Sequence, residues 1–85
     1  MSKGEKMFIN KSSDGLNNIS GGNIKSKRKQ LGISQRELAD KLQIAGLDLD
    51  KNAVQRIECG KRFVTDIEIK IFSAVLEMTF EEILS

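Results

Sequence analysis

The sequence predicts an all-α domain of five helices, for three reasons. Proline, which interrupts helices, is absent from all 85 residues. Leu and Ile recur at helical spacing in several stretches, whereas a β-sandwich requires more alternation of β-branched residues and more turn signals. Three segments begin with Ser or Thr followed three residues later by Glu, which is the capping box of a helix start.

The first helix is expected to begin near Asn23 and to end at Gly32. Ile24 and Leu31 lie seven residues apart and therefore share one face. The pair Gly21-Gly22 disfavours an earlier start, because glycine is a poor helix former.

The second helix is expected to begin with the capping box Ser34-Gln35-Arg36-Glu37 and to end near Gly46. Ile33 and Leu38 occupy the two positions of a hydrophobic staple around this cap. The buried stripe of the helix is expected to consist of Leu38, Ala39 and Leu42.

The third helix is expected to begin from Asp50, with Asp48 as an alternative cap, and to run to Cys59 before the stop at Gly60. The boxes Thr65–Glu68 and Thr79–Glu82 begin the fourth and fifth helices. The expected buried residues of these two helices are Ile67, Ile71, Phe72, Val75, Leu76, Phe80, Ile83 and Leu84.

Residues 1–17 are expected to form a flexible N-terminal tail, and residues 18–85 the folded domain. Ser, Asn, Gly and Lys dominate the tail, and Met7-Phe8-Ile9 is its only apolar cluster. A short arm through these three residues is the alternative.

The composition excludes most catalytic chemistry. The chain has no His and a single cysteine, Cys59, so a His base, a Ser-His-Asp triad and an internal disulfide are impossible, and zinc binding is disfavoured. Neither a phosphate-binding glycine loop nor a pair of catalytic carboxylates is evident. The longest apolar run is far shorter than a membrane span. We expect a cytoplasmic, non-enzymatic protein with no cofactor, metal, membrane contact or evident small-molecule ligand.

Charge is distributed unevenly along the chain. Residues 24–62 carry ten Lys or Arg against five Asp or Glu, and residues 63–85 carry one Lys against five acidic residues. Such asymmetry is typical of a nucleic-acid-binding face with an acidic back, although an ordinary solvated surface can also produce it.

The third helix has the side chains of a DNA-reading helix. At about 100° per residue, one arc of roughly 160° or less contains its polar side chains, with the apolar ones opposite. The arc holds Lys51, Asn52, Gln55, Arg56 and Cys59, and the opposite side holds Ala53, Val54 and Ile57. Arg pairs with guanine, and Asn and Gln pair with adenine, in the major groove. The same residue types also occur on surface helices that bind nothing.

The short helix predicted to begin at Ser34 favours the DNA-binding interpretation further. In a pair of helices joined by a short connection, the second can enter the major groove while the first braces it. Gln35 at the start of the first member is suited to hold a phosphate at the positive end of the helix dipole. Lys61 and Arg62 are placed for phosphates, or for compensating the dipole at the end of the reading helix.

Three stretches resemble the Cro/C1-type (XRE) helix-turn-helix family, which includes the N-terminal domains of lambdoid phage repressors. They are residues 24–39, which include Ile33-Ser34-Gln35-Arg36-Glu37-Leu38-Ala39, residues 54–62, which end in Ile57-Glu58-Cys59-Gly60-Lys61-Arg62, and residues 75–84. The resemblance covers about residues 18–85. It implies a five-helix, lambda-repressor-like domain that binds specific double-stranded DNA as a transcriptional regulator, usually a repressor.

The resemblance also implies roles for individual residues. It assigns base contacts to Lys51, Asn52 and Arg56, and base or backbone contact to Gln55. It assigns phosphate contact to Gln35 and DNA-backbone contact to Lys61 and Arg62. Finally, it implies an ion pair between Arg28 and Glu58. A homodimer on a paired site is expected, with Phe80, Ile83 and Leu84 as its candidate surface; alternatively these three fill the core. The second functional hypothesis is a protein-interaction module of the same fold, such as an antitoxin or an anti-repressor, with Met7–Ile9 as its hook.

The chain departs from the family pattern before the reading helix. Between Ala39 and Val54 it is about five residues longer, with the extra residues within 43–51. We expect a longer second helix or a wider turn, with Leu47 and Leu49 inserted into the core. This lengthened turn allows the reading helix to begin at a different residue, which affects Lys51 most, and it places Asp48 and Asp50 near the phosphates.

Overall fold

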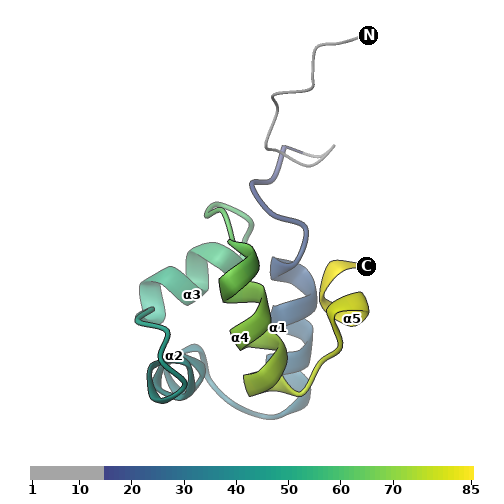
Figure 1. Ribbon diagram of the computed structural model, residues 1–85. Coiled ribbons are helices and arrows are strands. Elements are labelled where there is room, and N and C mark those ends of the chain that lie inside the picture. Colours follow the sequence, from purple (N-terminus) through teal and green to yellow (C-terminus); the bar gives the residue numbers. More distant parts are fainter. Residues whose placement is uncertain (1–14) are drawn as a thin grey trace, which may run out of the picture.

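The computed structural model describes residues 15–85, so the Met7–Ile9 cluster lies outside the described residues. This part of the chain contains five helices and no strand, which confirms the all-α prediction (Figure 1). The helices are α1 (Gly21–Gln30), α2 (Gln35–Ile44), α3 (Lys51–Glu58), α4 (Asp66–Leu76) and α5 (Phe80–Leu84). None of them is long and apolar enough to cross a membrane.

Four helix starts lie where the sequence predicts them. Ser34, Thr65 and Thr79 each form a complete capping box, in which the hydroxyl accepts from the backbone N–H three residues later and the Glu there accepts from the cap. Asp50, and not Asp48, caps α3, because its Oδ1 accepts from the N–H of Ala53 at 2.8 Å. The Asp50 cap sets the first residue of α3.

The predicted start of α1 is wrong by two residues. The helix begins at Gly21, which packs against α3 where no side chain fits, because a Cβ at this position would lie only 2.0 Å from the carbonyl oxygen of Ile57. The side chain of Asn18 supports the start by accepting from the N–H of Gly21 at 2.7 Å. Leu31 lies after the helix and is exposed, so that Arg28 shares the buried face with Ile24.

An aliphatic core lies between the helices, with Phe72 as its only aromatic member among the described residues. It consists of Ile24, Leu38, Ala39, Leu42, Leu49, Ala53, Val54, Ile57, Phe72, Leu76, Met78 and Ile83. The stripe predicted for α2 is buried as expected. In the lengthened turn, Leu49 is buried and Leu47 is half-buried against the core, as the sequence predicts.

Three apolar residues predicted to be buried are instead exposed. Ile67 is 68% exposed, Phe80 53% and Leu84 47%. Ile67 lies about 140° around α4 from Phe72, so Ile69 packs against the core in its place. In the short helix α5 only Ile83 is buried in the core, while Phe80 and Leu84, which lie four residues apart, face outward.

Asn17, immediately before the predicted start of the domain, contacts the segment after α3. The backbone N–H of Asn17 donates to the carbonyl of Gly60 at 2.8 Å, and its side chain donates to the carbonyl of Lys61 at 3.0 Å. Asn17, the last residue of the predicted tail, is thus bonded to the segment that follows α3.

Candidate nucleic-acid interface

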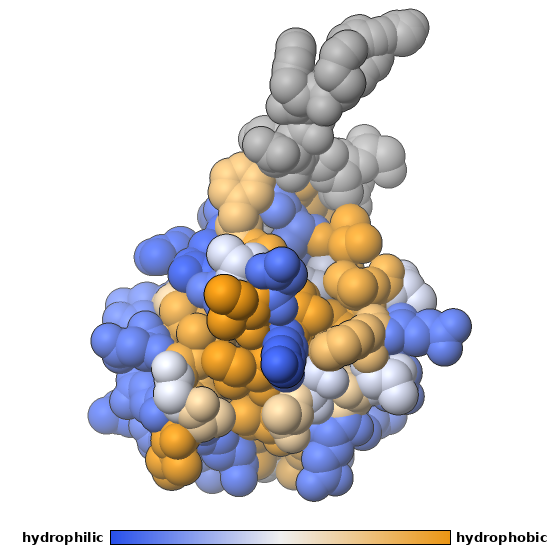
Figure 2. Space-filling view, in the orientation of Figure 1, coloured by the Kyte–Doolittle hydropathy of each residue, from blue (hydrophilic) through white to orange (hydrophobic). Residues whose placement is uncertain are grey.

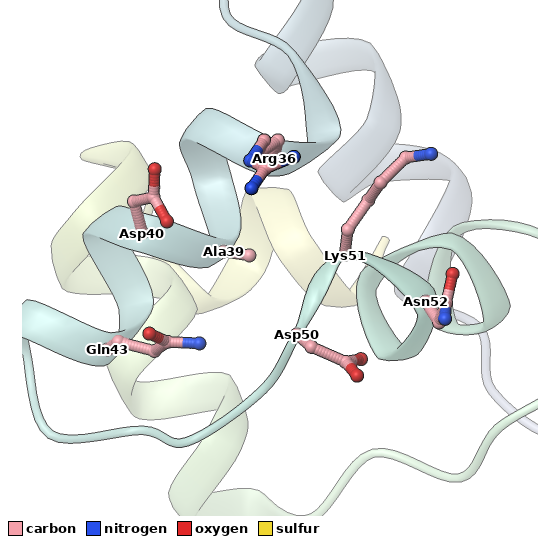
Figure 3. A pocket seen from close by; sticks show the side chains of 7 residues that line it. All are labelled: Arg36, Ala39, Asp40, Gln43, Asp50, Lys51 and Asn52. Carbon is pink, nitrogen blue, oxygen red and sulfur yellow. The ribbon is translucent and has the colours of Figure 1, made fainter.

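Helices α2 and α3 form a helix-turn-helix, with a hollow between α2 and the start of α3. The hollow is lined by Arg36, Ala39, Asp40, Gln43, Asp50, Lys51 and Asn52. Figure 3 shows Arg36 on α2 and Lys51 and Asn52 at the start of α3, on either side of this hollow. Two cations and several amide and carboxylate groups therefore surround one open depression.

Helix α3 separates its polar and apolar side chains as the helical wheel predicts. The apolar residues Ala53, Val54 and Ile57 are buried. The exposed side chains are Lys51, Asn52, Gln55, Arg56 and Cys59. Because Asp50 caps the helix, Lys51 is its first residue and lies on the exposed face with the others. The structure thus places all the predicted base-contacting residues on one accessible surface.

The lengthened segment before α3 is a wide turn and not an extension of α2. Gly46 adopts a φ of +98°, which favours glycine, and turns the chain away from α2. The N–H of Leu47 then donates to the carbonyl of Leu42 at 2.8 Å, and Gln43 Nε2 donates to the carbonyl of Leu49 at 3.2 Å. These bonds and the burial of Leu49 hold the start of α3 against α2.

A buried polar cluster joins α3 to α1 and α2. Arg28 binds Glu58 through two bonds, Nε to Oε2 at 2.6 Å and Nη2 to Oε1 at 3.1 Å, and its Nη1 donates to the carbonyl of Ile33 at 2.9 Å. Gln35 Nε2 donates to Glu58 Oε1 at 3.0 Å. The first residue of α2 is therefore bonded to the last residue of α3. The ion pair expected from the family resemblance is present, and Gln35 makes a contact that the sequence did not indicate.

The two basic residues after α3 differ in their surroundings. Lys61 is exposed. Arg62 instead forms a bidentate ion pair with Glu68, at 3.0 and 3.1 Å, and donates to the carbonyl of Phe63 at 3.0 Å. Burial raises the pKa of the Glu68 carboxyl, but the hydrogen bonds and charge of Arg62, together with bonds from the backbone and the side chain of Thr65, outweigh burial and lower that pKa.

Sequence reasoning missed Arg36 as a candidate contact residue. Its side chain is exposed and lies across the hollow from Lys51. The signal was available, because Arg36, Ala39, Asp40 and Gln43 follow the i, i+3, i+4, i+7 spacing of one helix face.

The comparisons with known proteins agree with this geometry. Residues 24–83 match the helix-turn-helix family. A similar solved structure is the restriction-modification controller protein C.AhdI from Aeromonas hydrophila, with a TM-score of 0.64 and 27% sequence identity over 74% of this chain and 84% of that chain. No curated protein matches the sequence. The chain belongs to the Cro/C1-type (XRE) helix-turn-helix family.

Proposed function

We infer that this protein is a DNA-binding transcriptional regulator that reads specific double-stranded sites in the major groove with α3. The observation that carries this inference is the exposed face of Lys51, Asn52, Gln55 and Arg56 on a helix held at both ends. Asp50 and the wide turn hold its start, and Glu58 holds its end. A rigidly held helix loses little conformational entropy on binding, which favours specific contacts.

Each polar side chain has a defined role in this proposal. Arg56 pairs with guanine, and Asn52 and Gln55 pair with adenine, because these are the bidentate matches of their donors and acceptors. Lys51 and Arg36 flank the hollow and contact bases or phosphates beside it. These contacts determine the sequence preference.

The phosphate contacts are divided differently from the expectation based on the family. Lys61 is exposed and binds phosphate. The amide nitrogen of Gln35 has two hydrogens, and one bond to Glu58 leaves the second for a phosphate at the start of α2. Arg62 braces α4 through Glu68 instead of binding DNA.

The apolar surface formed by α4 and α5 supports a homodimer. Val64, Ile69, Phe80 and Leu84 line a groove with Asp66, and the exposed Ile67 lies on the same helix as the groove residue Ile69. Figure 2 shows apolar side chains gathered over α4 and toward α5. A second copy seated there would pair two reading helices for a two-fold symmetric site. Ile83, the third expected interface residue, belongs to the core.

The proposed outcome of binding is repression in the cytoplasm. The similar structure is itself described as a controller protein of a restriction-modification system, which supports a regulatory role for this fold. The chain needs no further chemistry for this role, because a protein bound to DNA blocks other proteins from the same site.

Salt dependence of DNA binding tests this proposal. The purified protein should bind a duplex obtained by selection from a random pool, and affinity should fall about 10³-fold between 50 and 200 mM salt if six phosphates are contacted. A chain that shifts no duplex at low salt, but binds a protein partner tightly and without salt dependence, would instead be an interaction module such as an antitoxin or anti-repressor.

A further inference from the structure

Residues 16–18, called the strap below, lie against the end of α3 and the start of the connection between α3 and α4. The strap donates hydrogen bonds to the carbonyls of Ile57, Gly60, Lys61 and Arg62. Figure 1 shows the segment passing beside the α3–α4 connection before it enters α1. Gly60, Lys61 and Arg62 therefore each accept a hydrogen bond from a segment about forty residues earlier in the chain.

Asn18 joins three parts of the fold with one side chain. Its Oδ1 accepts from the N–H of Gly21 at 2.7 Å and thereby satisfies the first backbone N–H of α1. Its Nδ2 donates to the carbonyl of Ile57 at 3.1 Å, within α3, and to that of Arg62 at 2.8 Å. The end of the reading helix and the residue after Lys61 are thus held at a fixed separation.

The other two strap residues enclose the turn at Gly60. Gly60 has a φ of +80°, and a Cβ there would lie 2.7 Å from Leu16 Cδ2, so the leucine side chain packs directly on this glycine. Asn17 donates to Gly60 and Lys61 from its backbone and its side chain. The direction in which the chain leaves α3, and with it the start of the Lys61 side chain, depends on these contacts.

We propose that the strap is a positioning element for DNA binding, with Asn18 as its main positioning residue. It holds Lys61 beside the exposed face of α3, so that one phosphate contact and the base contacts form together. The Arg28–Glu58 pair fixes α3 only as far as Glu58, and the strap fixes the chain beyond it. This assignment rests on the proposed DNA-binding function of α3 and Lys61.

The decisive experiment compares Asn18→Ala with Asn23→Ala. Asn23 is a matched control, because its Nδ2 also donates to a distant carbonyl, that of Ile83 at 2.9 Å, but ties α1 to α5 away from the reading helix. Asn17→Ala serves as a milder variant that keeps the backbone bond to Gly60. Affinity for the selected duplex is measured against salt concentration, at a temperature where circular dichroism shows every variant folded.

Asn18→Ala should lower affinity roughly fivefold to tenfold at 0.1 M salt, and the salt slope should decrease by about 0.9, the value for one phosphate contact. Asn17→Ala should change both in the same direction, and Asn23→Ala should change neither. Amide hydrogen exchange at Lys61 should be faster in Asn18→Ala and, to a smaller extent, in Asn17→Ala, but unchanged in Asn23→Ala, since the Lys61 N–H donates to the carbonyl of Arg56 at the turn that the strap covers.

Two results overturn the proposal, and they are distinguishable. If the wild-type protein binds the duplex with steep salt dependence and Asn18→Ala has the same slope, the strap serves folding alone while the proposed function stands. If the wild-type protein itself binds no duplex, the proposed function fails, and the role of the strap in DNA binding fails with it.

Discussion

Arg28 and Glu58 form a buried bidentate ion pair that joins α1 to the last residue of α3. Their side chains are only 10% and 2% exposed, and the shorter bond, from Nε to Oε2, is 2.6 Å. Gln35 adds a third bond to the same carboxylate. One acidic side chain on α3 therefore orients this helix relative to both helices that precede it.

Removing one member of this pair should destabilise the domain strongly. Glu58→Ala leaves the Arg28 guanidinium buried without its counter-charge, and such losses cost about 3–5 kcal/mol. Chemical denaturation measures this change in the free energy of unfolding. Glu81→Ala, which removes an exposed carboxylate from α5, is the control and should change stability by less than about 0.5 kcal/mol. A Glu58→Ala protein that unfolds like the wild type would refute the structural role of the pair.

The Arg62–Glu68 pair should make stability depend on pH in the acidic range. Because the pKa of Glu68 is lowered in the folded protein, the unfolded chain binds a proton more readily at this site. The stabilisation is complete above the ordinary Glu pKa of about 4.3 and is lost as the pH falls through the lowered value.

The variant Glu68→Gln isolates this charge, since Gln also closes a capping box. It should cost about 1–2 kcal/mol at pH 7, near the lower end for bonds to charged groups, because Arg62 is partly exposed. Urea denaturation at pH 7 and pH 3 should show the difference from wild type shrinking in acid. A difference that stays constant between the two pH values would contradict this account.

The α4–α5 surface should mediate self-association. Phe80→Glu places a charge on the exposed apolar groove and should yield a folded monomer, whereas the wild-type chain should sediment as a dimer at high concentration. Ile44→Glu is the matched control, because Ile44 is 88% exposed at the far end of α2. If Phe80→Glu and the wild type had the same sedimentation coefficient, this surface would not be the dimer interface.

Bound DNA should protect Cys59 from alkylation. The thiol is the only one in the sequence, is exposed, and lies on the same arc of the helical wheel as Gln55 and Arg56. The rate of reaction with iodoacetamide should fall in proportion to the fraction of protein bound to the selected duplex. An unchanged rate at saturating duplex would place DNA away from this face of α3.

Local features of the fold were predictable from the sequence, because their physical causes lie within a few residues. The capping boxes at Ser34, Thr65 and Thr79 each depend on a group three residues away. The division of α3 into a buried and an exposed face follows from helical periodicity alone. The burial of Leu49 in the lengthened turn follows from the alternation of Leu and Asp.

Features that depend on distant partners were not predictable. The start of α1 was placed late because the low helix propensity of Gly21 is visible locally, whereas its contact with Ile57 is not. The outward position of Phe80 depends on how a short helix sits on α4. Gln35 bonds a residue that is 23 positions away in the sequence, and Asn18 bonds one that is 39 positions away. No spacing in the sequence indicates either contact.

Sequence selection with Arg56→Ala tests the central claim most directly, since this claim assigns base reading to the exposed face of α3. Wild type, Arg56→Ala and Lys61→Ala are each used to select duplexes from the same random pool. Arg56→Ala should lose its preference at one base pair, at a cost of about 1–3 kcal/mol, whereas Lys61→Ala should keep the wild-type preference and bind all sequences more weakly. An Arg56→Ala protein that selects the wild-type sequence unchanged would contradict the assignment.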